Sequence, residues 1–205
     1  MHDGDDFIQY CKTFFIPANN SETKYYAFRE EFNETGDRRK KSALFLYLNK
    51  HCYNGLCRYN KKGRFNTPFG LHKRPRLPVA EMQGFISAAE NTTFLQAGFT
   101  DSMRLARKGD VVYCDPPYAP LSKTAYFTDY HSGGFSWDDQ LLLARTARKL
   151  ADKGIQVVIS NHKTPEVCEL YKNAGAKINS FKVQRHISCD GNNRQKADEI
   201  LAVFV

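Results

Sequence analysis

Residues 110–120 read DVVYCDPPYAP, in which a short apolar strand pattern leads directly into a proline-rich turn. The turn consists of Asp115, Pro116, Pro117 and Tyr118. We predict that residues 111–114 form a buried strand. Because each proline fixes φ and has no N–H, the turn presents its carbonyl groups rigidly. Open α/β sheets bind ligands at the carboxyl ends of their parallel strands, so the stretch predicts a ligand site there.

The chemistry of this turn suits the exocyclic amino group of a nucleobase. The Asp115 carboxylate and the Pro116 carbonyl can each accept one hydrogen of that group, which draws the nitrogen lone pair out of ring conjugation. The lone pair can then attack a sulfonium methyl in line, a step that depends on positioning and electrostatics. Tyr118 can stack on a base extruded from a duplex. The plain alternative is a strand that merely ends in a proline-rich turn; the apolar strand before it favours the functional interpretation.

The C-terminal half alternates strand and helix patterns. We expect strands at 92–98, 110–115 and 155–160, a short helix after the first of them, and helices at 137–153 and 165–174. This order predicts a parallel α/β sheet. The segments 177–188 and 197–205, separated by the turn-rich CDGNNRQK, predict a β-hairpin at the end of the chain.

The N-terminal half is expected to hold helices at 22–33, 38–50 and 79–90, with a long loop at 51–78. Glycine, asparagine, proline, aromatic and basic residues interleave in this loop, and a loop of such length usually has a function. Arg58 suits a bidentate contact with guanine, while Tyr53 and Tyr59 are available for stacking. Residues suited to phosphate contacts are Lys61, Lys62, Arg64, Lys73, Arg74 and Arg76. The plain alternative is a solvated basic face with partly buried tyrosines.

Composition supports a polyanionic partner. Thirty Lys and Arg residues against 22 Asp and Glu give a net charge of +8, which favours nucleic acid but leaves open a soluble protein that is simply basic. The six cysteines form no CxxC pair and have no histidines at zinc-finger spacing, so no structural metal is expected and the thiols are interpreted as reduced packing residues. No apolar run approaches a membrane span, which predicts a soluble cytoplasmic protein.

The order of motifs along the chain resembles one family. DPPY is the signature of amino-methyltransferases. Around it stand FREEFN (28–33), LFLYLN (44–49), YNGLCRYN (53–60), FNTPFG (65–70), VVYCDPPYAPLS (111–122), ISNH (159–162) and DEILA (198–202). These segments follow one another in the order of Dam-type DNA adenine-N6 methyltransferases of the D12 class, from about Tyr25 to the end of the chain.

The resemblance implies a function and a set of site residues. The family transfers a methyl group from S-adenosyl-L-methionine to an adenine flipped out of double-stranded DNA, with GATC as the target. Asp115, Pro116, Pro117 and Tyr118 would be catalytic, and Asp115 would also bind the cofactor. The DNA-binding set would be Tyr53, Asn54, Leu56, Arg58, Asn60 and Pro68, with Arg58 at a guanine. One departure from the family is Leu71–His72, where an arginine that contacts phosphate and a tyrosine are usual.

The resemblance also implies a domain organisation and a partial fold. Residues 1–90 would be the helical target-recognition region and 91–205 the C-terminal part of a Rossmann-like methyltransferase domain. The family's glycine-rich cofactor segment and F-x-G-x-G turn are not found in the sequence. We therefore expect an N-terminally truncated chain that lacks the first sheet strands, transfers no methyl group by itself, and has a complementary N-terminal fragment as a partner.

Other functional interpretations remain open at this stage. The runner-up is a non-catalytic DNA-binding remnant of such an enzyme, and cofactor binding by the chain would separate the two. A methyltransferase that acts on RNA or on a protein amide is a third, but YNGLCRYN counts against it because this segment resembles the family's duplex-DNA reader. In either DNA-binding case we expect a monomer associated with the nucleoid.

Overall fold

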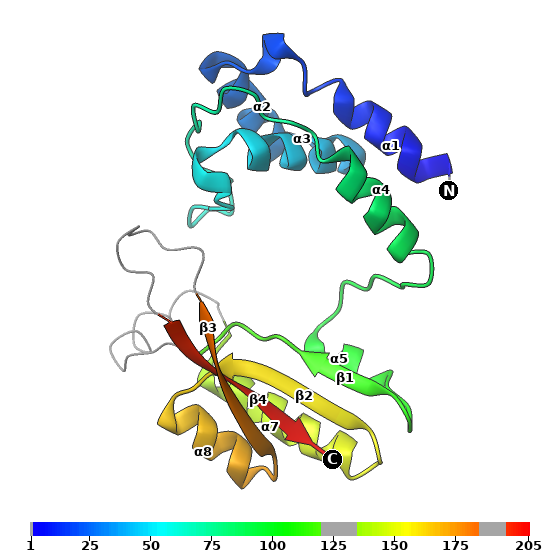
Figure 1. Cartoon of the computed structure of the whole chain (residues 1–205), viewed down its shortest axis with the longest axis vertical. Coiled ribbons are helices and arrows are strands. Elements are labelled where there is room, and N and C mark those ends of the chain that lie inside the picture. The colour runs from blue at the N-terminus through cyan, green and yellow to red at the C-terminus, as the bar shows by residue number, and fades with distance from the viewer. Residues whose placement is uncertain (1, 120–134, 185–195) are drawn as a thin grey trace. The chain divides into compact units, whose positions relative to one another are not determined.

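The computed structural model describes residues 2–119, 135–184 and 196–205, and its contacts divide the chain into two compact units (Figure 1). The first unit comprises Met1–Phe94 and the second Leu95–Val205. Each unit has its own cluster of buried hydrophobic side chains. The chain therefore forms two cores, one in each half.

Helices build the first unit. They are α1 (His2–Lys12), α2 (Glu22–Glu34), α3 (Arg38–His51) and α4 (Val79–Ala88), with 3-10 turns at Pro17–Asn19 and Tyr53–Gly55. The predicted helices at 22–33 and 38–50 are confirmed. Each begins at a local cap, because the side chains of Ser21 and Asp37 accept hydrogen bonds from first-turn N–H groups of α2 and α3. The long loop between α3 and α4 is also confirmed.

Aromatic side chains dominate the core of the first unit. Its fully buried members include Tyr25 and Tyr47, whose hydroxyl groups donate to the carbonyl oxygens of Thr67 at 2.9 Å and Asn19 at 2.6 Å. Burial raises the pKa of Tyr47 to about 12 and that of Tyr25 further, so both phenols keep their protons and remain donors. Thr67 belongs to the long loop, so the loop is tied directly to the helical core.

A mixed four-stranded sheet forms the second unit. Its elements are α5 (Phe99–Arg104), β1 (Val111–Cys114), α7 (Trp137–Ala151), β2 (Gln156–His162), α8 (Pro165–Asn173), β3 (Lys177–Gln184) and β4 (Lys196–Phe204). The strand order is β1-β2-β4-β3. β1 and β2 are parallel, whereas β4 is antiparallel to both β2 and β3. The predicted terminal hairpin is thus confirmed, and the predicted parallel sheet is correct only for β1 and β2.

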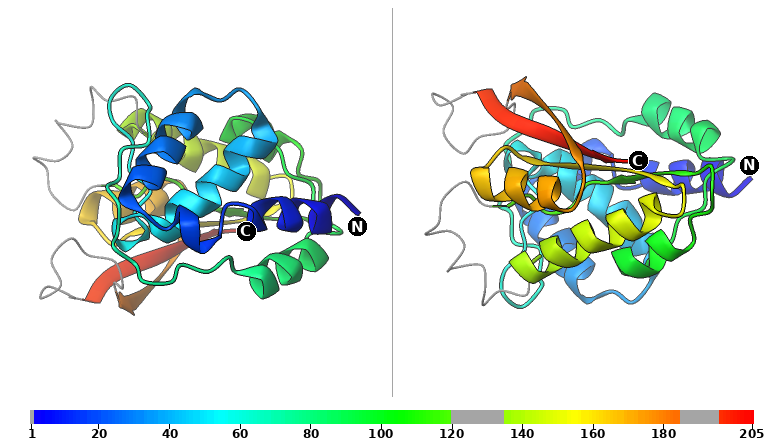
Figure 2. Two further views of the ribbon diagram at one scale, coloured as in Figure 1. Left: turned by 90° about the horizontal axis from the view of Figure 1, so that it is seen from above. Right: turned by 90° about the horizontal axis from the view of Figure 1, so that it is seen from below.

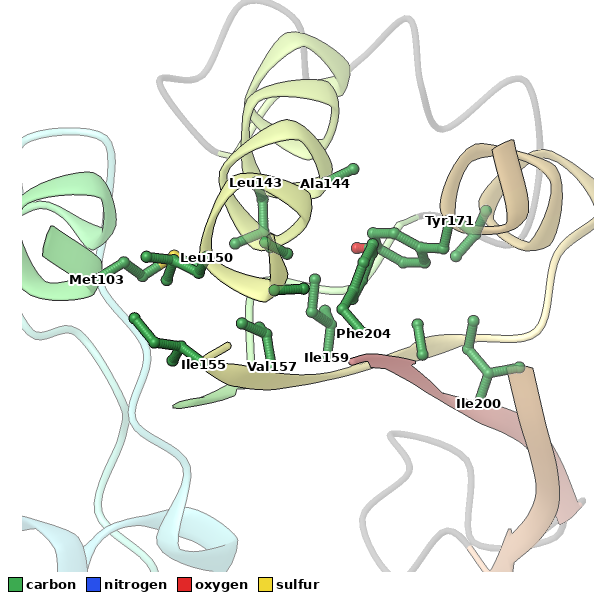
Figure 3. Close-up of a cluster of buried hydrophobic side chains, with 14 of the residues drawn as sticks. Met103, Leu143, Ala144, Leu150, Ile155, Val157, Ile159, Tyr171, Ile200 and Phe204 are labelled. Atoms are coloured by element: carbon green, nitrogen blue, oxygen red, sulfur yellow. The ribbon is translucent and has the colours of Figure 1, made fainter. Parts of the chain in front are cut away.

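α7 and α8 lie on the same face of this sheet (Figures 1 and 2). α7 begins with a capping box between Ser136 and Asp139, and its apolar residues recur at helical spacing so that one side is buried. Figure 3 shows how this side meets the sheet: Leu143 points toward Val157 and Ile159 of β2, and Leu150 lies beside Met103. The second core therefore lies between the helices and one sheet face.

Two sequence predictions about strands are wrong. Residues 92–98 form no strand; they are exposed and have no ladder partner, and without pairing their β-propensity fixes no structure. β1 is a strand but is not buried, because Val111 and Tyr113 are 63% and 62% exposed. Alternate side chains of a strand point to opposite faces, so only Val112 and Cys114 reach the core.

The packing of α7 gives a stability test with a matched control. Leu143→Ala removes a side chain that is 1% exposed, and we expect it to lower the free energy of unfolding of the second unit by about 2–5 kcal/mol. Leu142→Ala, at a neighbouring position that is 45% exposed, should change it by about 0.5 kcal/mol or less. Urea unfolding followed by the fluorescence of Trp137, the single tryptophan, measures both. Equal losses would contradict the assigned orientation of α7.

Candidate active site and nucleic-acid-binding loop

Asp115 follows β1 directly and is held by the neighbouring strand. β1 and β2 pair in parallel with Cys114 opposite Ile159, so the next residue of β2, Ser160, lies beside the start of the turn. The Ser160 hydroxyl donates to Asp115 Oδ1 at 2.7 Å. Asp115 itself is exposed. One carboxylate oxygen is therefore fixed by the protein, while the side chain remains accessible to a ligand.

Tyr118 is fixed by two neighbours from the sheet. Its hydroxyl donates to Glu199 Oε2 at 3.4 Å, and its ring meets the His162 ring edge-on, with centroids 4.9 Å apart at an interplanar angle of 83°. Burial raises the pKa of Tyr118, so the phenol stays neutral at physiological pH. The His162 ring is in turn positioned by the turn, since its Nδ1 lies 2.9 Å from the Ala119 carbonyl oxygen. Tyr118 thus has a defined orientation at the sheet edge.

A buried polar network holds the second half of the turn. Gln140, Asn161 and Tyr171 are each 2% exposed or less. Gln140 Nε2 donates to the Pro117 carbonyl at 3.1 Å, and the Ala119 N–H donates to Asn161 Oδ1 at 3.0 Å. The network thus holds the turn by one carbonyl and one N–H.

The members of this network also satisfy one another. Burial raises the pKa of Tyr171 to about 12, and its hydroxyl donates to Gln140 Oε1 at 2.8 Å, which also accepts from Asn161 Nδ2 at 3.2 Å. A fully paired buried network of this kind is rigid, because breaking any bond leaves a polar group without a partner in the core.

A cavity of about 500 Å³ opens beside the turn, entirely within the second unit. Among its lining residues are Phe99, Met103, Val112, Asp115, Phe135 and Leu143. This lining is mainly apolar, with one carboxylate, and its size lies within the range of small-molecule sites. The cavity can therefore accept an organic ligand next to Asp115.

Sequence reasoning identified Asp115 to Tyr118 but assigned no role to the residues that hold them. Ser160 and Asn161 lie in the ISNH segment, which served only as a mark of resemblance. Gln140 gave a signal that was missed: it falls on the apolar side of α7, three and four residues before Leu143 and Ala144. A lone amide on an otherwise apolar helix face indicates a buried hydrogen-bond role.

The loop between α3 and α4 folds back on itself and forms no regular strands. Two isolated antiparallel bridges, Cys52 with Phe69 and Tyr59 with Phe65, bring its two arms together. Tyr53 and Asn54 stand at the turn after α3; Tyr53 is 54% exposed, and Asn54 adopts the left-handed region at φ +51, which asparagine tolerates. The loop is thus an ordered hairpin-like surface.

The structure brings the remaining predicted DNA-binding residues onto these two arms. Arg58, Asn60 and Pro68 are exposed, and Leu56 is half-buried. The Pro68 carbonyl accepts from the Tyr53 N–H at 2.9 Å, which joins the ends of the set. Asn60 Oδ1 accepts from the N–H groups of Lys62 and Arg64 and so closes the turn between the arms.

Arg64 and His72 of the loop have structural contacts of their own, whereas Leu71 is exposed. Arg64 forms ion pairs with Glu30 and Glu34 of α2, which directs it to the helix surface. Leu71 is 82% exposed at φ +55, a conformation that strains a side chain without a local hydrogen bond. His72 Nε2 lies 3.1 Å from the Cys52 carbonyl oxygen. Arg64 and His72 therefore brace the loop.

Two general features concern the residues that the structure describes. Among them no group of three or more His, Cys, Asp and Glu side chains could hold a metal ion. None of the helices found there has the length and apolar character needed to cross a membrane.

A strand thus leads into Asp-Pro-Pro-Tyr beside an apolar cavity, on a mixed α/β sheet, which is the arrangement expected for an amino-methyltransferase. The chain matches the model of D12 class N6 adenine-specific DNA methyltransferases over residues 2–187. It therefore belongs to this family, and its function is that of an adenine-N6 DNA methyltransferase. The mixed sheet and its helices accord with a methyltransferase fold.

Individual relatives agree with the family assignment. The chain is 47% identical to a DNA adenine methylase of Escherichia coli (strain K12). The 200 aligned residues cover 98% of this chain and 71% of the relative. The same shares hold for a DNA adenine methylase of Salmonella typhi at 48% identity. A DNA adenine methylase of Vibrio cholerae serotype O1 is 46% identical over 199 residues, which cover 97% of this chain and 71% of the relative.

The buried network gives a second stability test. Asn161→Leu leaves the buried N–H of Ala119 without a partner, which costs about 1–3 kcal/mol, and removes one of the two hydrogen bonds to Gln140 Oε1. We expect the midpoint of urea unfolding, followed by Trp137 fluorescence, to fall clearly. Asn179→Leu on β3 exchanges the same residue types at an exposed position and should leave the midpoint nearly unchanged. If Asn161→Leu were as stable as the parent chain, the network would not hold the turn.

Proposed function

We propose that the chain methylates the N6 atom of adenine in GATC sites of double-stranded DNA, with S-adenosyl-L-methionine as methyl donor. The observation that supports this most is the conjunction of Asp115, an ordered proline turn and an apolar cavity at the end of one strand. Methyl transfer to an amino nitrogen needs acceptors for the hydrogens of that nitrogen and a neighbouring site for the methyl donor. The turn would provide the acceptors, and the cavity beside it would provide the donor site.

The hydrogen bonds of the turn indicate which carbonyl would meet the adenine. The Pro117 carbonyl already accepts from Gln140. For the Pro116 carbonyl no hydrogen bond is found within the described part of the chain. Asp115 and the Pro116 carbonyl would therefore accept the two N6 hydrogens, and Tyr118 would stack on the ring of the extruded base. The rate advantage would come from positioning rather than from a strong base.

The cavity beside the turn fits S-adenosyl-L-methionine by its chemistry. Phe99 and Phe135 offer aromatic surface to a purine, and the Asp115 carboxylate suits a ligand that is positively charged at sulfur. When bound, this donor supplies an electrophilic methyl group. Apolar residues around it, such as Val112 and Leu143, would exclude water from the reacting atoms.

The hairpin-like loop of the first unit would read the DNA. Its exposed Arg58 suits the O6 and N7 acceptors of guanine in the major groove. Tyr53, Asn54, Leu56, Asn60 and Pro68 would complete the contact surface, as the resemblance implies. The net charge of +8 supports this role because phosphate contacts provide most of the affinity for DNA.

Methyl transfer tests the proposal directly. With the chain fused behind a relative's N-terminal cofactor segment, we expect tritium from labelled S-adenosylmethionine to appear at adenine N6 in a GATC duplex, to vanish with Asp115→Ala and to fall sharply with Tyr118→Ala. The assay uses the 205-residue chain and the chain fused behind a relative's N-terminal cofactor segment. The first form also tests the expectation that the chain alone transfers no methyl group. No adenine methylation with either form would contradict the proposal and favour a non-catalytic DNA-binding protein.

Two substitutions in the loop separate base reading from phosphate binding. Arg58→Ala should weaken binding to GATC by about 1–3 kcal/mol while leaving binding to a duplex with an altered guanine nearly unchanged. Lys61→Ala should weaken binding to both duplexes alike and reduce the slope of affinity against salt. Fluorescence anisotropy across a salt series measures both effects. Equal, sequence-independent losses would show that Arg58 contacts only phosphate.

A further inference from the structure

We infer that Asn66, supported by Thr67, is a specificity-determining residue that positions the guanidinium of Arg58 for one guanine. This inference rests on the proposed role of Arg58 in reading DNA. It concerns two residues of the opposite arm of the loop, to which the sequence pattern assigned no function. Their contacts fix both the backbone and the side chain of Arg58.

The backbone of Arg58 is anchored through Thr67 to the helical core. Thr67 is 1% exposed, and its Oγ1 accepts from the Arg58 N–H at 3.2 Å while donating to the Leu56 carbonyl at 2.7 Å. The Thr67 carbonyl in turn accepts from Tyr25 of α2 at 2.9 Å and from Arg29 of the same helix at 3.1 Å. The Cα of Arg58 is therefore fixed relative to a rigid helix.

Asn66 then holds the side chain by one edge of its guanidinium. Arg58 Nε donates to Asn66 Oδ1 at 2.8 Å, and Arg58 Nη2 donates to the Asn66 carbonyl at 3.0 Å. A guanidinium has five N–H donors in a fixed plane. Two of them, on the Nε–Nη2 edge, are occupied by Asn66. Three donors remain, and they lie at the Nη1–Nη2 end, which is the end that can form a bidentate contact.

This arrangement favours discrimination more than general affinity. An exposed arginine samples many rotamers, and ordering it on binding has an entropic cost. Asn66 orders the Arg58 side chain before DNA binds. The entropic cost is therefore absent for a bidentate contact made by the Nη1–Nη2 end of the guanidinium. Phosphates can be met by an arginine in many orientations, whereas guanine O6 and N7 require one. Loss of Asn66 should therefore affect guanine reading selectively.

The test measures DNA binding and does not depend on methyl transfer. Fluorescence anisotropy at one salt concentration compares a GATC duplex with duplexes in which one G·C pair at a time is replaced by A·T. Discrimination is the ratio of the two dissociation constants. The variants are Asn66→Ala, Asn66→Asp, Arg58→Ala and the double variant with alanine at both positions. Asn91→Ala, at an exposed position in the same unit, is the matched control.

We expect Asn66→Ala to reduce discrimination at one guanine by about three- to tenfold, with little change in binding to the altered duplex. Asn66→Asp keeps an acceptor for Arg58 Nε but adds a negative charge near DNA, so both duplexes should bind more weakly while discrimination is retained. In the Arg58→Ala background, loss of Asn66 should have no further effect on discrimination. Asn91→Ala should behave as the parent chain.

Other outcomes would overturn the inference in distinguishable ways. Equal weakening of both duplexes by Asn66→Ala would show a phosphate contact of its own. A reduction of discrimination by Asn66→Ala that persists in the Arg58→Ala background would show that Asn66 reads a base directly. If the parent chain distinguished no guanine, the proposed reading function of Arg58 and this inference would both fail. A helical circular dichroism spectrum and an unchanged unfolding midpoint confirm that each variant remains folded.

Discussion

The Asp-Pro-Pro-Tyr turn depends on the pairing of two buried amides. Gln140 and Asn161 lie on different elements, α7 and β2, and together they bind one carbonyl and one N–H of the turn. A proline pair limits the internal freedom of a turn but does not direct it in space. The amides provide that direction, because they are themselves buried and their hydrogen bonds can be satisfied in only one arrangement. The position of the second half of the turn thus follows from the packing of α7 on the sheet.

A similar relation exists in the first unit, where a loop without regular strands is nevertheless ordered. Its order comes from Thr67, whose backbone carbonyl is bound by α2 and whose hydroxyl binds the opposite arm. Buried tyrosines are well suited to such anchoring, since their rings add to the apolar core while the hydroxyl remains a donor. In both candidate sites, exposed residues are thus held in place by hydrogen bonds to buried polar groups.

Much of the local structure could be predicted from the sequence, since caps such as Ser21 and Asp37 and the apolar side of α7 are local signals. The Asp-Pro-Pro-Tyr turn could also be predicted, because two prolines after an apolar strand are unusual. Contacts between distant segments could not be predicted. The role of Asn66 depends on a register that pairs it with Arg58, and the exposure of Val111 depends on which sheet face the helices cover. Residues 92–98 have no partner strand, and a local sequence pattern could not show that this partner is missing.

The division of the chain into two cores has a consequence for divergence within the family. The residues proposed to recognise DNA belong to one hydrophobic core, and the residues proposed for chemistry belong to the other. Substitutions that remodel the loop around Arg58 are buffered by the aromatic core of the first unit and leave the amides behind Asp115 untouched. Under the proposed roles, substitutions in the first unit would alter the preferred nucleotide sequence while the residues of the reaction in the second unit stay the same.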